Sequence, residues 1–221
     1  MDHATARYNM VERQLRPNRV TGQSLLRAFG ALPRESFLGK EFQDVAYVDD
    51  PVPLGGDRYL MAPLAMARLL EAAQPGASDL ALVIGCATGY GAAVLSYMVG
   101  AVVALESDSA MAGEATETLT GLGIDTVAVV EGDLSGGYPD QAPYDVIFFE
   151  GAVPEVPEAI TAQLAEGGRL VAIFSGDGAG GISGGKAVLI SRHHGVLSRR
   201  SVFEMSAPPL PGFEPEKVFA F

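Results

Sequence analysis

The sequence contains no tryptophan, a single cysteine and three histidines among its 221 residues. The lone Cys86 excludes an internal disulfide, so we expect a protein of a reducing compartment. No histidine lies near Cys86 in the sequence, which favours a small buried residue over a catalytic nucleophile. His193 and His194 have no second cluster of candidate ligands, and we therefore expect no metal site.

Positive charge is also scarce. The chain has 15 Lys and Arg against 27 Asp and Glu, for a formal net charge of −12. Phosphate backbones would repel such a protein, so we expect no nucleic-acid partner. The N-terminal residues lack the apolar core of a secretory signal, which favours a cytoplasmic location. Hydrophobic residues at 48% and charged residues at 19% are typical of a globular chain of this length.

The most informative stretch is residues 80–106, which carries no charge from Leu80 through Leu105. Its glycines, tyrosines and internal turn argue against a membrane span, and buried parallel strands also read as continuous apolar runs. A strand, a glycine-rich turn, a helix and a second strand ending in an acid are typical of a nucleoside-cofactor site. These parts are expected at 80–84, at 85–89, at 90–98 with Gly100 as helix cap, and at 102–105 before Glu106.

The rest of the sequence predicts further helices and strands in an alternating order. This order predicts an α/β protein with a mostly parallel, seven-stranded sheet that ends in an antiparallel hairpin. We divide the chain into an N-terminal helical segment (1–76), a Rossmann-like domain (77–206) and a Pro-rich tail (207–221). The expected helices are 4–15 with Tyr8 on its apolar face, one capped by Thr21, one opened by Pro63, one capped by Asp108, and one opened by Pro157 carrying Leu164. Residues 33–53 are expected to be irregular, and residues 55–62 lead to the helix opened by Pro63. The later strands are expected at 126–130, 144–149, 170–174, 186–192 and 199–203.

Several short segments stand out along the chain. They are MVERQL (10–15), LPRESF (32–37), AYVD (46–49), PLG (53–55), GxxxGYxAAVL (85–95), EGD (131–133), APYD (142–145) and QLxxGGRLV (163–171). In this order and spacing, the segments resemble the protein-L-isoaspartate O-methyltransferase family over residues 7–174. The resemblance implies a Rossmann-like, S-adenosylmethionine-dependent methyltransferase fold with a helical N-terminal extension over the site.

The resemblance implies roles for individual residues in binding S-adenosyl-L-methionine. Glu106 stands where the family's acid holds the ribose hydroxyls, and Asp133 where its acid meets the adenine amino group. Gly85 and Gly89 match two glycines of the cofactor turn. The middle glycine of that turn is Ala87 here. If Ala87 has a positive φ, it adds about 1–2 kcal/mol of backbone cost.

Three further positions depart from the family. The acid that ends the family's opening strand is replaced by Val83. The family's hydroxyl-bearing loop, Gly-Gln-Thr-Ile-Ser-Gln-Pro, corresponds to residues 57–63, where Met61 replaces the key serine and Tyr59 the threonine. Arg58 would supply a two-pronged clamp for a substrate carboxylate and Tyr59 a hydroxyl. The alternative is that Arg58 lies on the surface and Tyr59 packs under the loop.

The resemblance therefore predicts a methyltransferase that acts on a carboxylate of a damaged protein, as in protein repair. Glu150 follows the 144–149 strand, where it would face the substrate or be a plain strand-end carboxylate. The alternative function is a non-catalytic or regulatory family member with weak or no cofactor binding. The departures at Val83, Ala87 and Met61 are what that alternative depends on.

Overall fold

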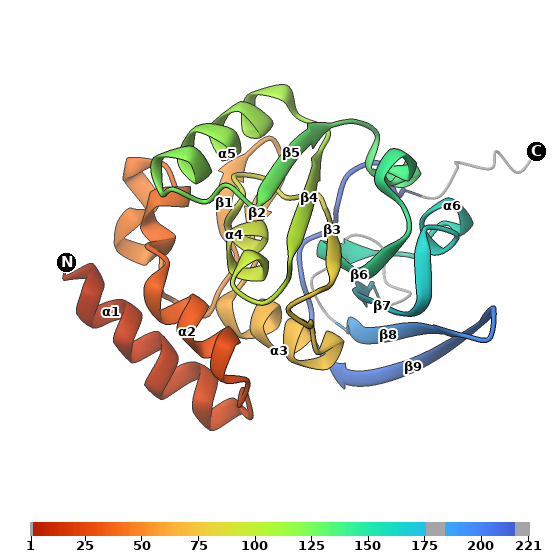
Figure 1. Cartoon of the computed structure of the whole chain (residues 1–221). Helices are drawn as coiled ribbons and strands as arrows, with labels where there is room; N and C mark the ends of the chain where they lie inside the picture. Colours follow the sequence, from red (N-terminus) through yellow and green to blue (C-terminus); the bar gives the residue numbers. More distant parts are fainter. Residues whose placement is uncertain (1, 176–183, 215–221) are drawn as a thin grey trace, which may run out of the picture.

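The computed structural model of the chain describes residues 2–175 and 184–214, and Figure 1 shows the arrangement of its elements. The helices are α1 (His3–Asn9), η1 (Met10–Leu15), η2 (Arg16–Asn18), α2 (Gln23–Ala31), η3 (Arg34–Phe37), η4 (Lys40–Val45), α3 (Pro63–Ala73), α4 (Tyr90–Ser96), α5 (Ser109–Gly121), η5 (Leu134–Gly136), η6 (Pro139–Gln141) and α6 (Glu158–Thr161). The strands are β1 (Val52–Gly55), β2 (Arg58–Leu60), β3 (Leu80–Ile84), β4 (Ala101–Glu106), β5 (Val127–Glu131), β6 (Tyr144–Val153), β7 (Leu164–Phe174), β8 (Lys186–His193) and β9 (Val196–Glu204).

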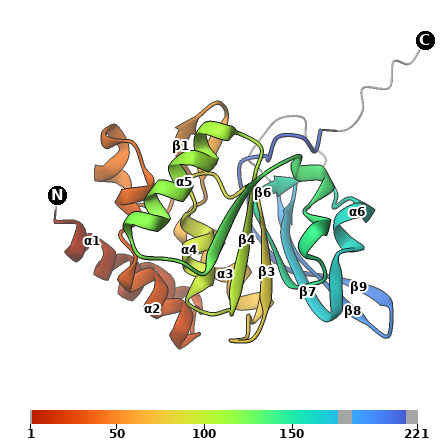
Figure 2. The ribbon, with the colours of Figure 1, turned by 45° about the horizontal axis from the view of Figure 1, so that its top comes forward.

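The main sheet has the strand order β5-β4-β3-β6-β7-β8-β9 within the described residues. The strands from β5 to β7 pair in parallel, and β8 and β9 pair antiparallel as a hairpin. Figure 2 shows β3, β4, β6 and β7 side by side, with α1 and α2 on one side and the hairpin on the other. The predicted fold is confirmed. Strand order reverses between β4 and β6 around β3, and such a switch point opens a crevice at the carboxyl ends of the strands.

The strands are apolar on both faces because each face is covered by a separate hydrophobic core. Val83 of β3 points into a core with helices η1, α2, α3 and α4, and Ile84 points into a second core on the opposite face. The second core includes Ile160 of α6 and two residues of the C-terminal segment, Leu210 and Phe213. The first core joins residues of the 1–76 segment to the sheet, and our division of the chain at residue 76 stays a prediction.

The helical predictions are confirmed where capping or periodicity was strong. Pro63 is the first residue of α3, and the Asp108 side chain accepts hydrogen bonds from the first turn of α5.

Two predictions near the N-terminus were wrong. The predicted helix continues from α1 into a π-helical turn, and Tyr8 is 65% exposed rather than packed. Thr21 does not cap α2; Gly22 holds that position, and the Thr21 hydroxyl donates to Glu71 at 2.6 Å.

Other predictions were wrong in position. Helix α4 ends at Ser96, before Gly100, since Tyr97 already closes its last turn. Leu164 is the first residue of β7 and not part of α6, whose helix has only one turn. An antiparallel hairpin, β1–β2, begins at the end of the segment expected to be irregular and continues through residues for which the sequence predicted no strand; its turn has positive φ at Gly55, Gly56 and Asp57. No described helix is long and apolar enough to cross a bilayer.

Candidate functional site

The turn between β3 and α4 is held against the end of β4. The amides of Gly85 and Cys86 both donate to the carbonyl oxygen of Leu105, at 2.9 and 3.0 Å. Gly85 and Gly89 have φ of 74° and 95°, and Ala87 has φ of 49°. The turn therefore keeps the conformation of a glycine-rich loop even though its middle residue is alanine. The expected strain at Ala87 is present.

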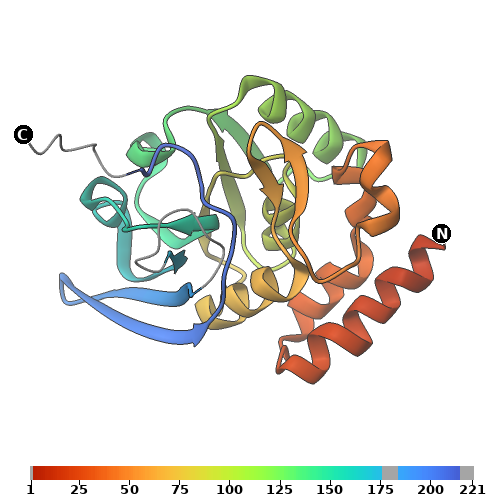
Figure 3. The same ribbon diagram turned by 180° about the vertical axis from the view of Figure 1, so that it is seen from behind.

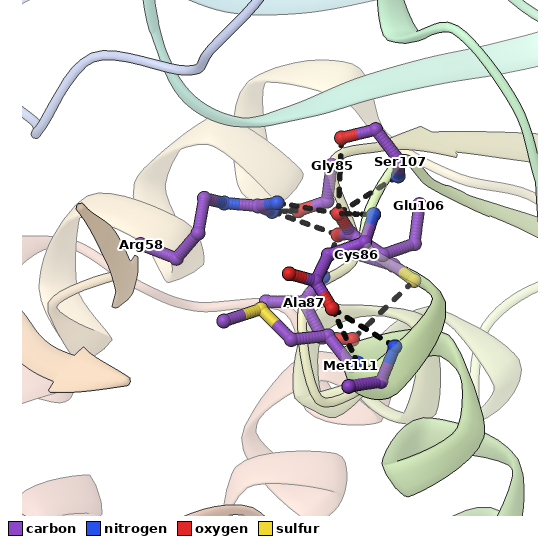
Figure 4. Close-up of polar contacts among 9 residues, drawn as sticks. Arg58, Gly85, Cys86, Ala87, Glu106, Ser107 and Met111 are labelled. Carbon is purple, nitrogen blue, oxygen red and sulfur yellow. Dashed lines mark hydrogen bonds and ion pairs between the residues drawn. The ribbon is translucent and has the colours of Figure 1, made fainter. Parts of the chain in front are cut away.

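The Glu106 carboxylate lies against this turn, at the carboxyl end of β4 (Figure 4). Its side chain has no exposed surface. The Ala87 amide donates to Oε2 at 2.7 Å, and the amides of Ser107 and Asp108 donate to Oε1 at 2.8 and 3.1 Å. The position expected for a ribose-binding acid is thus occupied by a carboxylate that the turn itself holds in place.

Arg58, from the short strand β2, occupies the open side of the Glu106 carboxylate. Its Nη2 donates to Glu106 Oε2 at 2.8 Å and to the carbonyl oxygen of Gly85 at 3.1 Å, and its Nη1 donates to Glu106 Oε1. Arg58 is 5% exposed, so the alternative of a surface arginine is wrong. Burial opposes ionisation of Glu106, but the hydrogen bonds and charge of Arg58 outweigh it and lower the pKa of Glu106.

Residues Ala207–Phe213, which we call the C-terminal strap, cover the same edge of the sheet. In Figure 3 the chain after β9 climbs from the hairpin to the upper edge of the sheet. A methyl group on Gly85 would lie 2.7 Å from Cδ2 of Leu210, and one on Gly151 would lie 2.6 Å from Cγ of Leu210. Phe213 packs edge-on against Phe149, with ring centroids 5.6 Å apart. Sequence reasoning treated this stretch as a tail, although Leu210 and Phe213 were apolar signals within it.

Asp133 lies at the next strand end, after β5. Its carboxylate caps η5 by accepting from the amide of Ser135 at 3.0 Å, and also from the Ser135 hydroxyl. A methyl group on Gly212 of the strap would lie 3.9 Å from Asp133 Oδ1. Asp133 is exposed, so its carboxylate remains reachable beside the strap.

Glu150 lies in the extended part of β6 and is 5% exposed. Its carboxyl group lies against Gly91 of α4, where it leaves no room for a side chain, and its Oε1 has no hydrogen-bond partner. Burial raises the pKa of Glu150 to about 8; Arg58, Glu106 and Arg34 are the charged groups around it. The group is therefore largely protonated at neutral pH. Glu150 is not a plain exposed strand-end carboxylate.

The catalytic-loop residues separate in the structure. Met61 is 1% exposed in the first core, and its carbonyl oxygen accepts from Nη2 of Arg34 at 2.7 Å. Tyr59 is 37% exposed and does not pack under the loop. Arg34 is fully buried, with its guanidinium 4.8 Å from the ring centre of Tyr90. Arg34 fixes the loop before α3, and in the sequence it stood out only as part of the segment LPRESF (32–37) that carries the family resemblance.

Cys86 has no exposed surface, and burial raises the pKa of its thiol well above the ordinary value. It is a packing residue, as the sequence indicated. Within residues 2–175 and 184–214, no three His, Cys, Asp or Glu side chains come together as metal ligands.

Comparison with known proteins identifies what this arrangement belongs to. The sequence model of the family "Protein-L-isoaspartate(D-aspartate) O-methyltransferase (PCMT)" matches residues 6–177. The chain is 39% identical over 168 residues to the protein-L-isoaspartate O-methyltransferase of Koribacter versatilis (strain Ellin345), covering 76% of each chain. It is 37% identical over 170 residues to the enzyme of that name from Methanoregula boonei, covering 77% of this chain and 78% of the relative.

Solved structures give the same result. A protein-L-isoaspartate O-methyltransferase superposes with a TM-score of 0.80 at 30% identity, over 94% of this chain and 67% of that one. A Plasmodium falciparum protein assigned to the same enzyme class, in complex with S-adenosyl-L-homocysteine, gives 0.76 at 17% identity over 96% and 99% of the two chains. The latter likeness concerns the fold alone.

Proposed function

Because the chain belongs to the protein-L-isoaspartate O-methyltransferase family, we propose that it methylates the carboxylate of isoaspartyl residues in damaged proteins. The chain is an S-adenosylmethionine-dependent methyltransferase. The comparisons give no support to the non-catalytic alternative. The observation that carries the proposal is the family match over residues 6–177, within which Glu106 lies beneath the turn that begins at Gly85.

The residues of the site fit the cofactor, whereas the space beside them is filled by other side chains. Glu106 ends β4 as a ribose-binding acid would, and the turn from Gly85 to Gly89 keeps its left-handed residues. The space next to Gly85 is the one a glycine leaves for a ligand, and Leu210 and Arg58 enter it here. The chemistry of the residues thus agrees with the family's cofactor, and its binding requires these two side chains to move.

In this proposal Glu106 would hold the ribose hydroxyls and Asp133 the adenine amino group. The cofactor, when bound, supplies an electrophilic methyl group on a sulfonium, and the substrate carboxylate is already a deprotonated nucleophile. The protein's task is therefore alignment in a site that excludes water. Glu106 contributes by keeping its carboxylate ionised and fixed, since three backbone amides orient it.

We assign Arg58 as the clamp for the substrate carboxylate. Its guanidinium lies in the site, and its geometry suits a two-pronged pair with a carboxylate, as its pairing with Glu106 illustrates. In this assignment the ribose hydroxyls replace Arg58 as the partners of Glu106. Arg58 then pairs with the substrate carboxylate instead. Tyr59 follows Arg58 in β2, and its exposed side chain is available to an incoming peptide.

Glu150 is assigned as a substrate-facing donor. A protonated carboxyl group donates a hydrogen bond, whereas an ionised one would repel a substrate carboxylate. The unpartnered Oε1 and the raised pKa of Glu150 favour the protonated form at neutral pH. This donor would substitute for the hydroxyl that is absent at Met61, whose side chain points into the core.

The proposal also includes a protein substrate, no nucleic-acid partner and a cytoplasmic location. The net charge of −12 supports the lack of a nucleic-acid partner, and the single cysteine supports the cytoplasmic location.

The test is methyl transfer to a peptide that carries isoaspartate, beside the same peptide with ordinary aspartate. We expect turnover with the first only. Glu106→Gln should weaken S-adenosylhomocysteine binding in calorimetry by about tenfold or more, the effect of losing one charge-assisted hydrogen bond. Glu131→Gln is the matched control, because Glu131 pairs beside Glu106 in the register but is exposed. Equal turnover of both peptides, or none, would refute the proposed activity.

A further inference from the structure

We propose that the C-terminal strap is an internal competitor of the cofactor: it closes the site, and cofactor binding requires Leu210 to leave the space beside Gly85. The inference concerns regulation of the site described above and rests on the proposed function.

The first argument is the position of Leu210. Its side chain occupies the space beside two glycines at once, Gly85 of the cofactor turn and Gly151 of β6. Nη2 of Arg58 reaches the same point, 3.4 Å from where a methyl group on Gly85 would lie. Leu210 is 4% exposed and Phe213 is 7% exposed, so this is a packed contact and not a loose tail.

The second argument is the way in which the strap is attached. Two backbone hydrogen bonds join it to the end of β6, from the Ala152 amide to the Pro208 carbonyl and from the Leu210 amide to the Ala152 carbonyl, both 2.8 Å. They form an isolated parallel bridge rather than a ladder. Segments held by few backbone bonds open at low free energy without unfolding the domain. The strap therefore suits a part that opens while β6 stays in place.

The third argument is the extent of the family match, which ends at residue 177. Everything that fills the site from the C-terminal side lies beyond that range. Glu106, Gly85 and Gly89 lie within it. The binding residues thus belong to the part shared with the family, and the strap to the part outside the match.

A closed site has a measurable consequence. If only the open form binds, the apparent dissociation constant equals the intrinsic one divided by the open fraction. Weakening the strap raises the open fraction and tightens binding. Removing a residue that binds the cofactor would instead weaken cofactor binding.

The experiment measures S-adenosylhomocysteine affinity by calorimetry in the full chain and in Leu210→Ala. We expect about tenfold tighter binding to the variant, because a truncated leucine loses most of its packing on the two glycines. Leu197→Ala on β9 is the matched control, since Leu197 is 41% exposed and lies outside the site; its affinity should be unchanged.

Hydrogen exchange of the unmodified protein gives a second readout that needs no variant. The Leu210 amide should exchange faster when S-adenosylhomocysteine is added, while amides inside β6 such as that of Phe148 keep their protection. Unchanged Leu210 protection in the bound protein, or equal affinities of the full chain and Leu210→Ala, would overturn the strap as competitor while leaving the proposed function intact. Absence of binding to every variant at millimolar ligand would overturn both.

Discussion

Arg58 and Glu106 form a buried, two-pronged ion pair that joins the β1–β2 hairpin to the end of β4, across 48 residues of sequence. The pair places a cation on the carboxylate that we propose as the one that binds the ribose hydroxyls. The ion pair therefore has a structural role, and in the proposed function it competes with the ribose for Glu106.

Replacing Arg58 by glutamine should destabilise the ligand-free protein. Breaking a buried ion pair from one side costs about 3–5 kcal/mol, because a charge is left in the interior without its partner. Urea unfolding followed by circular dichroism suits a chain without tryptophan. Arg16→Gln is the control, since Arg16 pairs with Glu12 on the surface at 2.8 Å and should change stability by less than about 1 kcal/mol. Equal losses in the two variants would contradict the importance of the buried pair.

Glu150 should make the protein less stable as pH rises from about 5 to 8. Its pKa is about 8 in the folded chain against an ordinary value of 4.5, so in this window the unfolded chain loses a proton that the folded chain keeps. The folded form is then disfavoured by an amount that grows with pH and levels off above about 8. Arg58, Glu106 and Arg34 face the same group, so the difference between the wild type and Glu150→Gln is the quantity to measure. The free energy of unfolding of Glu150→Gln minus that of the wild type should increase from pH 5 to 8. A difference that does not change with pH would refute the raised pKa of Glu150.

Ala87→Gly should stabilise the chain. Alanine at φ of 49° carries strain that glycine does not, and its replacement should gain about 1 kcal/mol, reduced by the greater freedom of glycine in the unfolded chain. Ala115→Gly in helix α5, where Ala115 is fully buried, should instead lose about 1 kcal/mol. Thermal melts of the two variants give the comparison. A loss at Ala87 similar to that at Ala115 would show that the turn is not strained.

Restoring the family's serine at Met61 should not restore a catalytic hydroxyl. The Met61 side chain is in the first core, so Met61→Ser leaves a cavity with a polar group and should cost about 2–5 kcal/mol without raising turnover. Met61→Leu keeps volume and polarity and should cost less than about 1.5 kcal/mol. Increased isoaspartyl methylation by Met61→Ser would show that the loop reaches the substrate in a way this conformation does not.

The sheet could be predicted from sequence because its elements are specified locally. The apolar run at 80–84, the proline that opens α3 and the aspartate that caps α5 each depend on residues a few positions apart. The β1–β2 hairpin was missed because its strands have four and three residues, too short for an alternating pattern to stand out. Tyr8 was misplaced because periodicity shows that a helix has two faces but not how far the neighbouring elements extend over them.

The sequence by itself determined the βαβ unit, its terminal acid and the family, since these depend on residue types at short, ordered spacings. Only the tertiary structure decided the environment of that acid. Arg58, 48 positions before Glu106, and Leu210, more than a hundred positions after it, meet beside Gly85 because the β1–β2 hairpin and the strap both cross the carboxyl edge of the sheet. No local pattern encodes that meeting. Strand ends that are far apart in the chain converge at one edge of the sheet. Which side chains fill the space there depends on packing between distant segments, and the sequence alone does not indicate that these segments are in contact.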